Sequence, residues 1–465
     1  MVTDDTASAS PLGPKPGFVT TRLSIMMFLQ FFVWGAWYVT VGNYMGAHGM
    51  ADHIYLAYIV GPIAAIVSPF FLGMIADRFF ATERVLGILH ILGGLFMFLA
   101  PVVATRSDDP RLFIAVLLLH MLCYMPTLGL TNTEAFHHIT NQERQFPVIR
   151  VFGTIGWIAA NWVVSKWLHA DKEAVQFFVT GGAGLALGLF SFVLPHTPPP
   201  GVGKQVKFTE IIGLDALRKL SSVSFYVFLV SSFLICIPLA AYYSYAPVFA
   251  DNVGMQDVAF NMSFGQIAEI VFMLAMPLFF MFLGVKWMLL IGMLAWVVRY
   301  GLFSAAATDG IIWMVLGGIL LHGICYDFFF VTGFIYTDKK STPEIRGQAQ
   351  GLLVLVTQGL GLGLGAFLIG KLVNYSKSSE YDTLTEQAGQ FRDEYAQLTE
   401  QAGGQVTEQA QSLWNQATDA LLSTYDWRMI WLIPCVMAAA VMIGFFLFFR
   451  DDTKKNPADS ADAAA

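Results

Sequence analysis

The chain has 465 residues, of which 56% are hydrophobic and only 13% are charged, and its formal net charge is −7. A soluble domain carries about 25% charged residues because its surface faces water. The composition therefore excludes a soluble enzyme, a disordered chain and a protein that binds nucleic acid through a basic surface, and it favours a protein whose surface faces lipid.

Apolar runs dominate the pattern along the chain. A polar stretch over 1–20 predicts a disordered tail, and after it come twelve apolar runs, each long enough to cross a bilayer as a helix of about 20 residues. They lie near 22–46, 54–76, 84–105, 111–133, 146–168, 173–194, 223–250, 259–283, 286–306, 311–337, 346–373 and 427–449. Because the runs are continuous rather than alternating, we predict an all-α membrane protein with twelve transmembrane helices.

Basic residues orient these helices. With the N-terminus inside, the inside segments hold about twice as many Lys and Arg residues as the outside segments, which predicts that both termini are cytoplasmic. The chain then divides into five parts. These are a disordered tail at 1–20, a six-helix bundle at 21–195, a cytoplasmic linker at 196–222, a second six-helix bundle at 223–450 and a cytoplasmic tail at 451–465.

Short motifs support two related halves. The sequence PVIR at 147–150 opens the fifth span, and PEIR at 343–346 stands at the start of the eleventh. Repeated halves of this kind place a substrate site between them, near the middle of the bilayer. Between spans two and three, GMIADR at 73–78 resembles the loop signature of the major facilitator superfamily, and an ordinary charged turn is the alternative.

Polar and aromatic side chains share one face in four of the spans. Residues three or four apart lie on one side of a helix, and ionisable groups inside a membrane are costly, so they commonly line a cavity or pathway. The sets are Gln30, Trp34 and Tyr38 in span one; Arg150, Thr154, Trp157 and Asn161 in span five; Ser263, Gln266 and Glu269 in span eight; and His322, Tyr326 and Phe330, with Asp327 beside them, in span ten. We predict that these four spans line one cavity.

These residues also have structural interpretations. Arg150 is close enough to the inner end of its span to extend to the cytoplasmic surface. His322 can be a packed histidine bonded to the backbone, and the aromatic residues can be packing groups. Glu269 lies near mid-membrane, too deep for its side chain to reach water, so we expect it to have a function.

The predicted cavity suits a neutral solute with hydroxyl groups or a heterocyclic base. Gln266 and Glu269 offer hydrogen-bond donors and acceptors, and aromatic rings stack on planar bases. No cluster of Arg and Lys suits an anionic solute, and no GxxxxGK[ST] motif indicates use of ATP. Because carboxyl groups can take and release protons, we expect Glu269 or Asp327 to couple transport to the proton gradient.

Enzyme chemistry is not expected. The sequence shows no pairing of a nucleophile with a base. Its four cysteines lie far apart in apolar runs, without the spacing of a zinc site or of a disulfide framework. We therefore predict no catalytic residues, no metal site and no cofactor, with the proton as the coupling ion.

Longer motifs run through both halves. They are FLQFFVWGAW at 28–37, YMPTLGLTNT at 124–133, FPVIRVFGTIG at 146–156, QIAE at 266–269, YDFF at 326–329 and IRGQAQG at 345–351. Together they resemble the bacterial nucleoside:proton symporter family of the major facilitator superfamily, the family of the nucleoside and xanthosine permeases. The resemblance covers about 22–373 and 426–450. It implies a proton-driven nucleoside importer of the bacterial inner membrane, in which Arg150, Thr154, Trp157, Gln266, Glu269, Tyr326 and Asp327 surround the nucleoside.

Two spans depart from the family pattern. Span seven of the family carries amides that contact the solute, and this chain has Ala240 and Tyr243 there. The family tyrosine before the aromatic-Asp pair is His322 in this chain. Tyr243 and His322 therefore join Gln30, Trp34 and the residues above in the predicted binding site, and the resemblance does not say which nucleosides bind.

A long outer segment at 374–426 is the other departure. It contains TEQA three times, and apolar residues spaced three and four apart run on both sides of Gly403-Gly404. We predict two antiparallel helices outside the membrane, serving either as a site for a partner or as a solubilising spacer. Because 376–426 contains nine acidic and two basic residues, it accounts for the whole net charge.

Two other functions remain open from the sequence. One is a sugar or oligosaccharide:proton symporter on the same fold. The other is a solute receptor or membrane scaffold that does not transport.

Overall fold

Helices form almost all of the computed structural model, which describes residues 16–71, 80–199, 213–342 and 344–452. Among these residues there is no strand. The first half contains α1 (Pro16–Tyr38), α2 (Val41–Ala47), a short 3-10 turn (Ala51–His53), α3 (Ile54–Phe71), α5 (Thr82–Arg106), α6 (Pro110–His138), α7 (Gln142–Asn161), a π-helical segment (Trp162–Trp167) and α8 (Val175–Ser191). The motif at 73–78, most of both predicted tails, residues 200–212 of the predicted linker and residue 343 lie outside the described residues.

The second half has more breaks in its helices. It contains α10 (Leu214–Lys219), α11 (Val223–Asn252), α12 (Val258–Met262), α13 (Phe264–Asp309), α14 (Ile312–Leu320), α15 (His322–Cys325), a π-helical segment (Tyr326–Val331), α16 (Thr332–Lys340), α17 (Arg346–Val354), a π-helical segment (Leu355–Gly361), α18 (Leu362–Tyr375), α19 (Tyr381–Gln401), α20 (Glu408–Leu422) and α21 (Trp427–Phe448). Extra residues in π-helical turns shift the faces of a helix and are frequent at functional sites.

Side-chain caps begin several of these helices. The first backbone N–H groups of a helix have no partner within the helix, and a preceding Asp, Asn, Ser or Thr can accept from them. Asp109 does so for α6, Asn141 for α7, Ser222 for α11 and Asp426 for α21. The boundaries of these helices therefore follow directly from local sequence.

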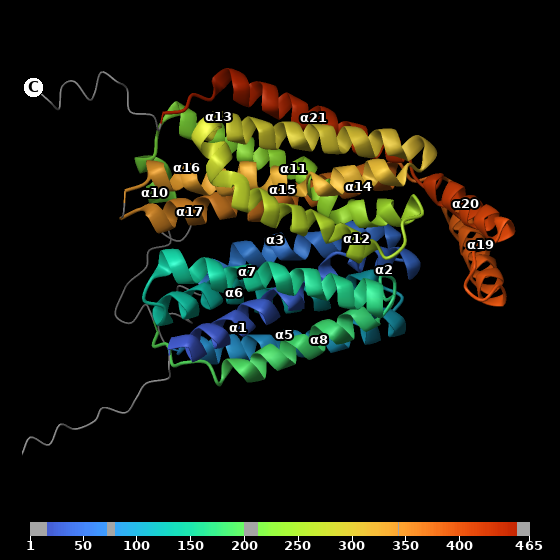
Figure 1. Ribbon diagram of the computed structural model, residues 1–465, viewed down its shortest axis with the longest axis horizontal. Helices are drawn as coiled ribbons and strands as arrows, with labels where there is room; N and C mark the ends of the chain where they lie inside the picture. The colour runs from blue at the N-terminus through green and yellow to red at the C-terminus, as the bar shows by residue number, and fades with distance from the viewer. Residues whose placement is uncertain (1–15, 72–79, 200–212, 343, 453–465) are drawn as a thin grey trace, which may run out of the picture.

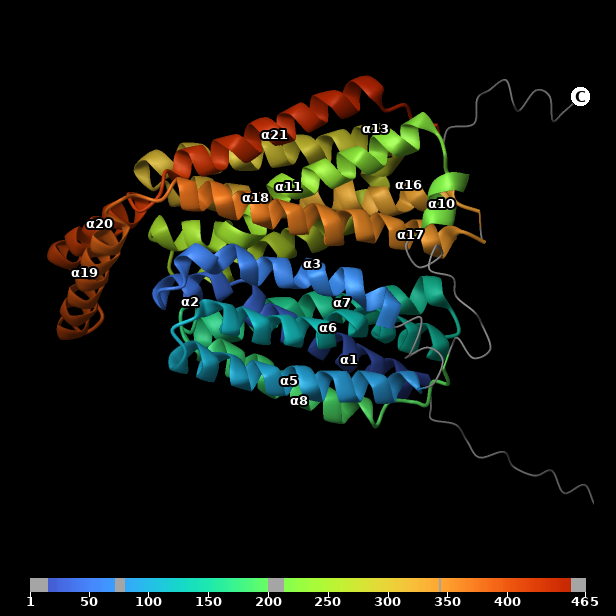
Figure 2. The same ribbon diagram turned by 180° about the vertical axis from the view of Figure 1, so that it is seen from behind.

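The two halves lie side by side. Figure 1 shows α1 to α8 below and α10 to α18 with α21 above, and the long helices run roughly parallel to one another. Across the boundary α3 packs against α18, which Figure 2 shows from behind. The described chain begins and ends at one end of the bundle, whereas α19 and α20 project beyond the other end. We call that second end the hairpin end.

Ten helices in the described part of the chain are long and apolar enough to cross a membrane. One of them runs over Val258–Asp309 and contains the two predicted spans at 259–283 and 286–306. These meet at Gly284, whose φ of 66° and ψ of −177° are non-helical. Leu274 and Phe282 near this break are 79% and 75% exposed, as expected for side chains that face lipid.

Glycines allow close packing inside each half. A Cβ atom at Gly156 of α7 would overlap the carbonyl of Phe28 in α1, and one at Gly35 of α1 would meet the backbone of Trp157 at 3.0 Å. These contacts bring the polar faces of α1 and α7 together, because both helices approach each other without side chains between them.

The segment at 374–426 contains two helices that pack against each other, α19 and α20. Gly403 and Gly404 have φ values of 65° and 88° in the turn between them, a conformation that favours glycine. At the base, Asp426 donates its backbone N–H to Ser376 at 3.0 Å, and Ser378 donates to Thr424 at 2.9 Å. The segment therefore leaves and rejoins the bundle at nearly the same point.

Candidate functional site

A cavity lies between the two halves, and helices of both contribute to it. Its lining is Phe31, Trp34 and Tyr38 of α1; Arg150, Thr154 and Trp157 of α7; Tyr243 of α11; Gln266 and Glu269 of α13; His322 of α15; Tyr326 of the following π-helical segment; and Gln358 and Leu362 from the eleventh predicted span. Nine of the eleven residues predicted to bind substrate from the sequence therefore lie around one cavity.

Aromatic rings form one wall. The rings of Trp34 and Trp157 meet edge to face, with centroids 5.5 Å apart and planes at 79°. Tyr38 joins both halves of this wall, with its centroid 5.5 Å from Trp34 and 6.3 Å from Tyr243. Edge-to-face contacts stabilise aromatic clusters. The cluster therefore presents several rings of fixed orientation to the cavity.

Charged and polar groups complete the lining. The guanidinium of Arg150 lies over the ring of Phe31 at 4.2 Å, and both residues line the cavity, so Arg150 does not extend to the cytoplasmic surface. On the opposite half, the Glu269 carboxylate lies 4.0 Å from Nε2 of His322. That separation is too long for a hydrogen bond, so the carboxylate is available to a solute.

His322 is supported from behind by a stack of buried groups. Its ring stacks on Tyr242 with centroids 5.4 Å apart and planes at 18°. The guanidinium of Arg299 also lies over the Tyr242 ring, 4.1 Å from its centroid, and its Nε donates to the carbonyl of Gly318. His322 is therefore positioned by packing, and its ring edge faces Glu269.

Gln30 and Asp327 do not line the cavity. Gln30 is fully buried, donates to Thr127 at 2.8 Å and bonds to His90 at 2.8 Å. The bond from Gln30 Nε2 joins α1 to α6, and the bond at Gln30 Oε1 joins α1 to α5. Both polar atoms of the amide therefore have partners outside the cavity. Asp327 is fully buried next to Tyr326, and neither of its carboxylate oxygens has a hydrogen-bond partner among the described residues. Asp327 therefore lies behind the lining.

Four lining residues were not in the predicted site. Tyr38 belongs to the face of span one that is predicted to line the cavity, but it is not among the residues predicted to bind substrate. Phe31 lies one position after Gln30. Its side chain lines the cavity, whereas the Gln30 amide donates to Thr127 instead. Gln358 and Leu362 come from the glycine-rich eleventh span. Gln358 could have been found from the sequence, because a polar residue within an apolar span commonly lines a cavity.

Comparisons with known proteins show the family to which the chain is similar. The model of a family described as nucleoside H+ symporter matches residues 18–391. The putative nucleoside transporter YegT of Escherichia coli (strain K12) is 36% identical over 95% of this chain and 96% of its own length. The nucleoside permease NupG of Escherichia coli (strain K12) is 32% identical over 76% of this chain and 87% of its own length. A crystal structure of the nucleoside transporter NupG superimposes with a TM-score of 0.74 at 26% identity, covering 93% of this chain and 99% of the other.

Proposed function

The chain belongs to the nucleoside H+ symporter family, and we therefore propose that it imports nucleosides together with protons by alternating access. The observation that carries the proposal is the cavity between the halves, whose lining combines aromatic rings with Arg150, Gln266 and Glu269. Alternating access requires a site that both halves share, because their rocking exposes it first to one side and then to the other.

The lining matches the two parts of a nucleoside. Flat faces near Trp34, Trp157 and Tyr243 suit a planar base, for which stacking on an aromatic ring contributes about 1–3 kcal/mol. Gln266 and Glu269 suit ribose hydroxyl groups, since an amide both donates and accepts and a carboxylate accepts. Hydroxyl recognition by a charged acceptor also favours a nucleoside over a bare nucleobase.

Two carboxyl groups are proposed to carry the coupling proton. Glu269 lines the cavity, and Asp327 follows Tyr326 in the same π-helical segment. Carboxyl groups within a membrane commonly form proton pathways. Proton binding at Glu269 or Asp327 favours the solute-binding state, so that the gradient drives uptake. No further cofactor enters this mechanism.

We propose twelve membrane crossings in two six-helix bundles. The break at Gly284 divides α13 into two crossings, and α8 (Val175–Ser191) is a shorter apolar helix that supplies another. These two additions to the ten long helices give six crossings in each half. The protein then lies in the bacterial inner membrane with both termini cytoplasmic and with α19 and α20 on the outside.

Transport into proteoliposomes tests the function. Radiolabelled uridine or adenosine is expected to enter faster with an inward proton gradient, and a protonophore is expected to remove the difference. Uptake that ignores the gradient would contradict the coupling. Competition by sugars without any effect of nucleosides would instead favour a sugar symporter, and binding without uptake would favour a receptor.

A further inference from the structure

Polar contacts between the two halves gather at the hairpin end. They include the ion pairs of Lys166 with Asp257 at 2.6 Å and of Lys172 with Asp251 at 2.7 Å, and the hydrogen bond from the Val258 backbone to Asp171 at 2.7 Å. Nearby, Trp162 of the first half donates to Ser263 of the second at 3.0 Å. In this conformation the halves are therefore closed against each other at the hairpin end.

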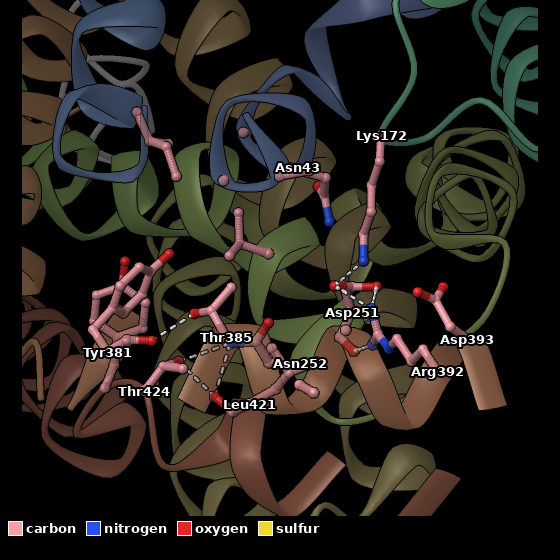
Figure 3. Close-up of a pocket in the computed structure, with 18 residues that line it drawn as sticks. Asn43, Lys172, Asp251, Asn252, Tyr381, Thr385, Arg392, Asp393, Leu421 and Thr424 are labelled. Atoms are coloured by element: carbon pink, nitrogen blue, oxygen red, sulfur yellow. Dashed lines mark hydrogen bonds and ion pairs between the residues drawn. The ribbon is translucent and has the colours of Figure 1, made fainter. Parts of the chain in front are cut away.

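Asp251 is the residue at which three parts of the chain meet. Lys172, from the loop before α8, contacts one carboxylate oxygen at 2.7 Å. Arg392, from α19, donates from Nη1 to both carboxylate oxygens, at 3.2 and 3.3 Å, and from Nη2 to the Asp251 carbonyl at 3.0 Å. Figure 3 shows the two cations approaching the carboxylate from opposite directions. The Asp251 side chain is only 16% exposed, so this charge depends on its partners.

The two cations belong to different halves. Arg392 lies between α18 and α21 in the chain, and these helices belong to the same half as Asp251. Lys172 belongs to the other half. When the halves separate at the hairpin end, the contact of Lys172 with Asp251 must break, whereas the contact of Arg392 with Asp251 can persist.

A cavity of about 350 Å³ lies beside these groups, bounded by α2, the end of α11, α19 and α20. Lys172, Asp251 and Arg392 all line it, together with Asn43 and Tyr381. The space leaves room for the Lys172 side chain, which is 33% exposed, to withdraw without repacking its neighbours.

We propose that Lys172, Asp251 and Arg392 form a latch that sets the balance between closed and open states at the hairpin end. Lys172 stabilises the closed state. Arg392 stabilises the open state, because it leaves Asp251 with a counter-charge after Lys172 has moved away, and in the closed state its attraction to Asp251 is partly offset by repulsion from Lys172. This inference rests on the proposed transport cycle, and it gives the α19–α20 pair a role in regulating that cycle.

The two cations are therefore expected to have opposite effects on opening. The probe is Ser263→Cys, a buried position beneath Trp162 at the boundary between the halves. Vesicles containing the full chain with Ser263→Cys, called the parent below, are treated from the outside with a membrane-impermeant maleimide. Labelling of the chain without Ser263→Cys is subtracted. Lys172→Gln is expected to speed labelling roughly 1.5- to fivefold, and Arg392→Gln to slow it by a similar factor, the range of one partly exposed ion pair.

Matched variants distinguish the latch from a simple clamp. Glu394→Gln changes an exposed charge on α19 and is expected to label at the parent rate. Arg392→Lys keeps the counter-charge and is expected to restore the parent rate. Faster or unchanged labelling in Arg392→Gln, with Arg392→Lys at the parent rate, would overturn the proposal.

Folding and transport are followed separately. If Arg392→Gln fails to fold, as shown by loss of its thermal transition, slower labelling of Lys172→Gln than of the parent would overturn the proposal instead. Labelling needs no nucleoside, so a failure of nucleoside uptake in the parent contradicts the proposed function and leaves the labelling result interpretable.

Discussion

Replacing Glu269 by Gln tests the centre of the proposed site. The substitution keeps the size of the side chain and its capacity for hydrogen bonds, but it removes the negative charge and the ability to bind a proton. Because His322 lies 4.0 Å away, no hydrogen bond to that ring is lost. The change therefore acts on the solute and the proton rather than on packing.

The size of the effect follows from the type of hydrogen bond. A hydrogen bond to a charged group contributes about 1.5–3 kcal/mol, against about 1 kcal/mol for a neutral pair. The difference of about 0.5–2 kcal/mol corresponds to a nucleoside Kd raised roughly 2- to 30-fold in Glu269→Gln. Uptake is expected to fall further, since the amide cannot carry the coupling proton.

Two measurements check this prediction. Quenching of tryptophan fluorescence reports binding, because Trp34 and Trp157 line the cavity. Proteoliposome uptake with and without a proton gradient reports coupling. Glu134→Gln is the matched control, since Glu134 is a fully buried carboxylate outside the cavity lining, and it is expected to keep the parent Kd. Gradient-driven uptake near the parent rate in Glu269→Gln would refute the reasoning.

Three further predictions follow from other parts of the structure. Gly156→Ala adds a methyl group against the α1 backbone and should destabilise the protein by about 1–3 kcal/mol, lowering its melting temperature, whereas Gly182→Ala meets nothing within 4 Å and should not. Burial, and secondarily the nearby Asp251 charge, raise the pKa of Asp171 to about 6, against the bonds from Ser165 and Val258. Opening hydrates Asp171 and lowers that pKa, so the closed state binds the proton more tightly. Labelling of Ser263→Cys, corrected for intrinsic thiol reactivity, should therefore slow as the outer pH falls from 7.5 to 5.5. Asp171→Asn should weaken this dependence, and the pair of His169 with Asp257 across the same boundary remains in that variant. Deleting 379–423 and joining the ends with a short glycine linker should leave uptake measurable, since none of these residues lines the proposed nucleoside cavity between the halves. Abolished uptake would favour a scaffold.

Helix periodicity was enough to predict much of the candidate site. Arg150, Thr154 and Trp157 are spaced three and four apart, and the structure places all three on the cavity side of α7. This spacing works because α7 is a regular helix until Asn161. Its close approach to α1 at Gly35 and Gly156 also fixes which neighbour its polar face meets.

Periodicity alone could not predict whether a residue near the edge of a helix face lines the cavity or bonds to a neighbouring helix. Gln30 is in phase with Trp34, yet its amide bonds to His90 and Thr127 on other helices, and Phe31 takes the place beside the cavity. Such bonds depend on the rotation of neighbouring helices, which the sequence of one span does not contain.

Local departures from helical geometry were also beyond the sequence pattern. The π-helical segment Tyr326–Val331 places Tyr326 in the cavity lining and Asp327 behind it. The π-helical segment contains only six residues, too few to alter a pattern averaged along a span. The break at Gly284, by contrast, falls between the spans predicted at 259–283 and 286–306, and its φ of 66° is a conformation that favours glycine.

The closed base of the α19–α20 pair has a practical consequence for imaging. A transporter of 51.3 kDa whose mass lies mostly within a detergent micelle offers few features by which particles can be aligned in electron microscopy. Here the paired helices project from one end, fixed at the base by the bonds of Ser376 with Asp426 and of Ser378 with Thr424 and along their side by Arg392. The protein thus carries its own alignment marker, and an antibody fragment raised against its acidic outer face would enlarge that marker without touching the transport cavity.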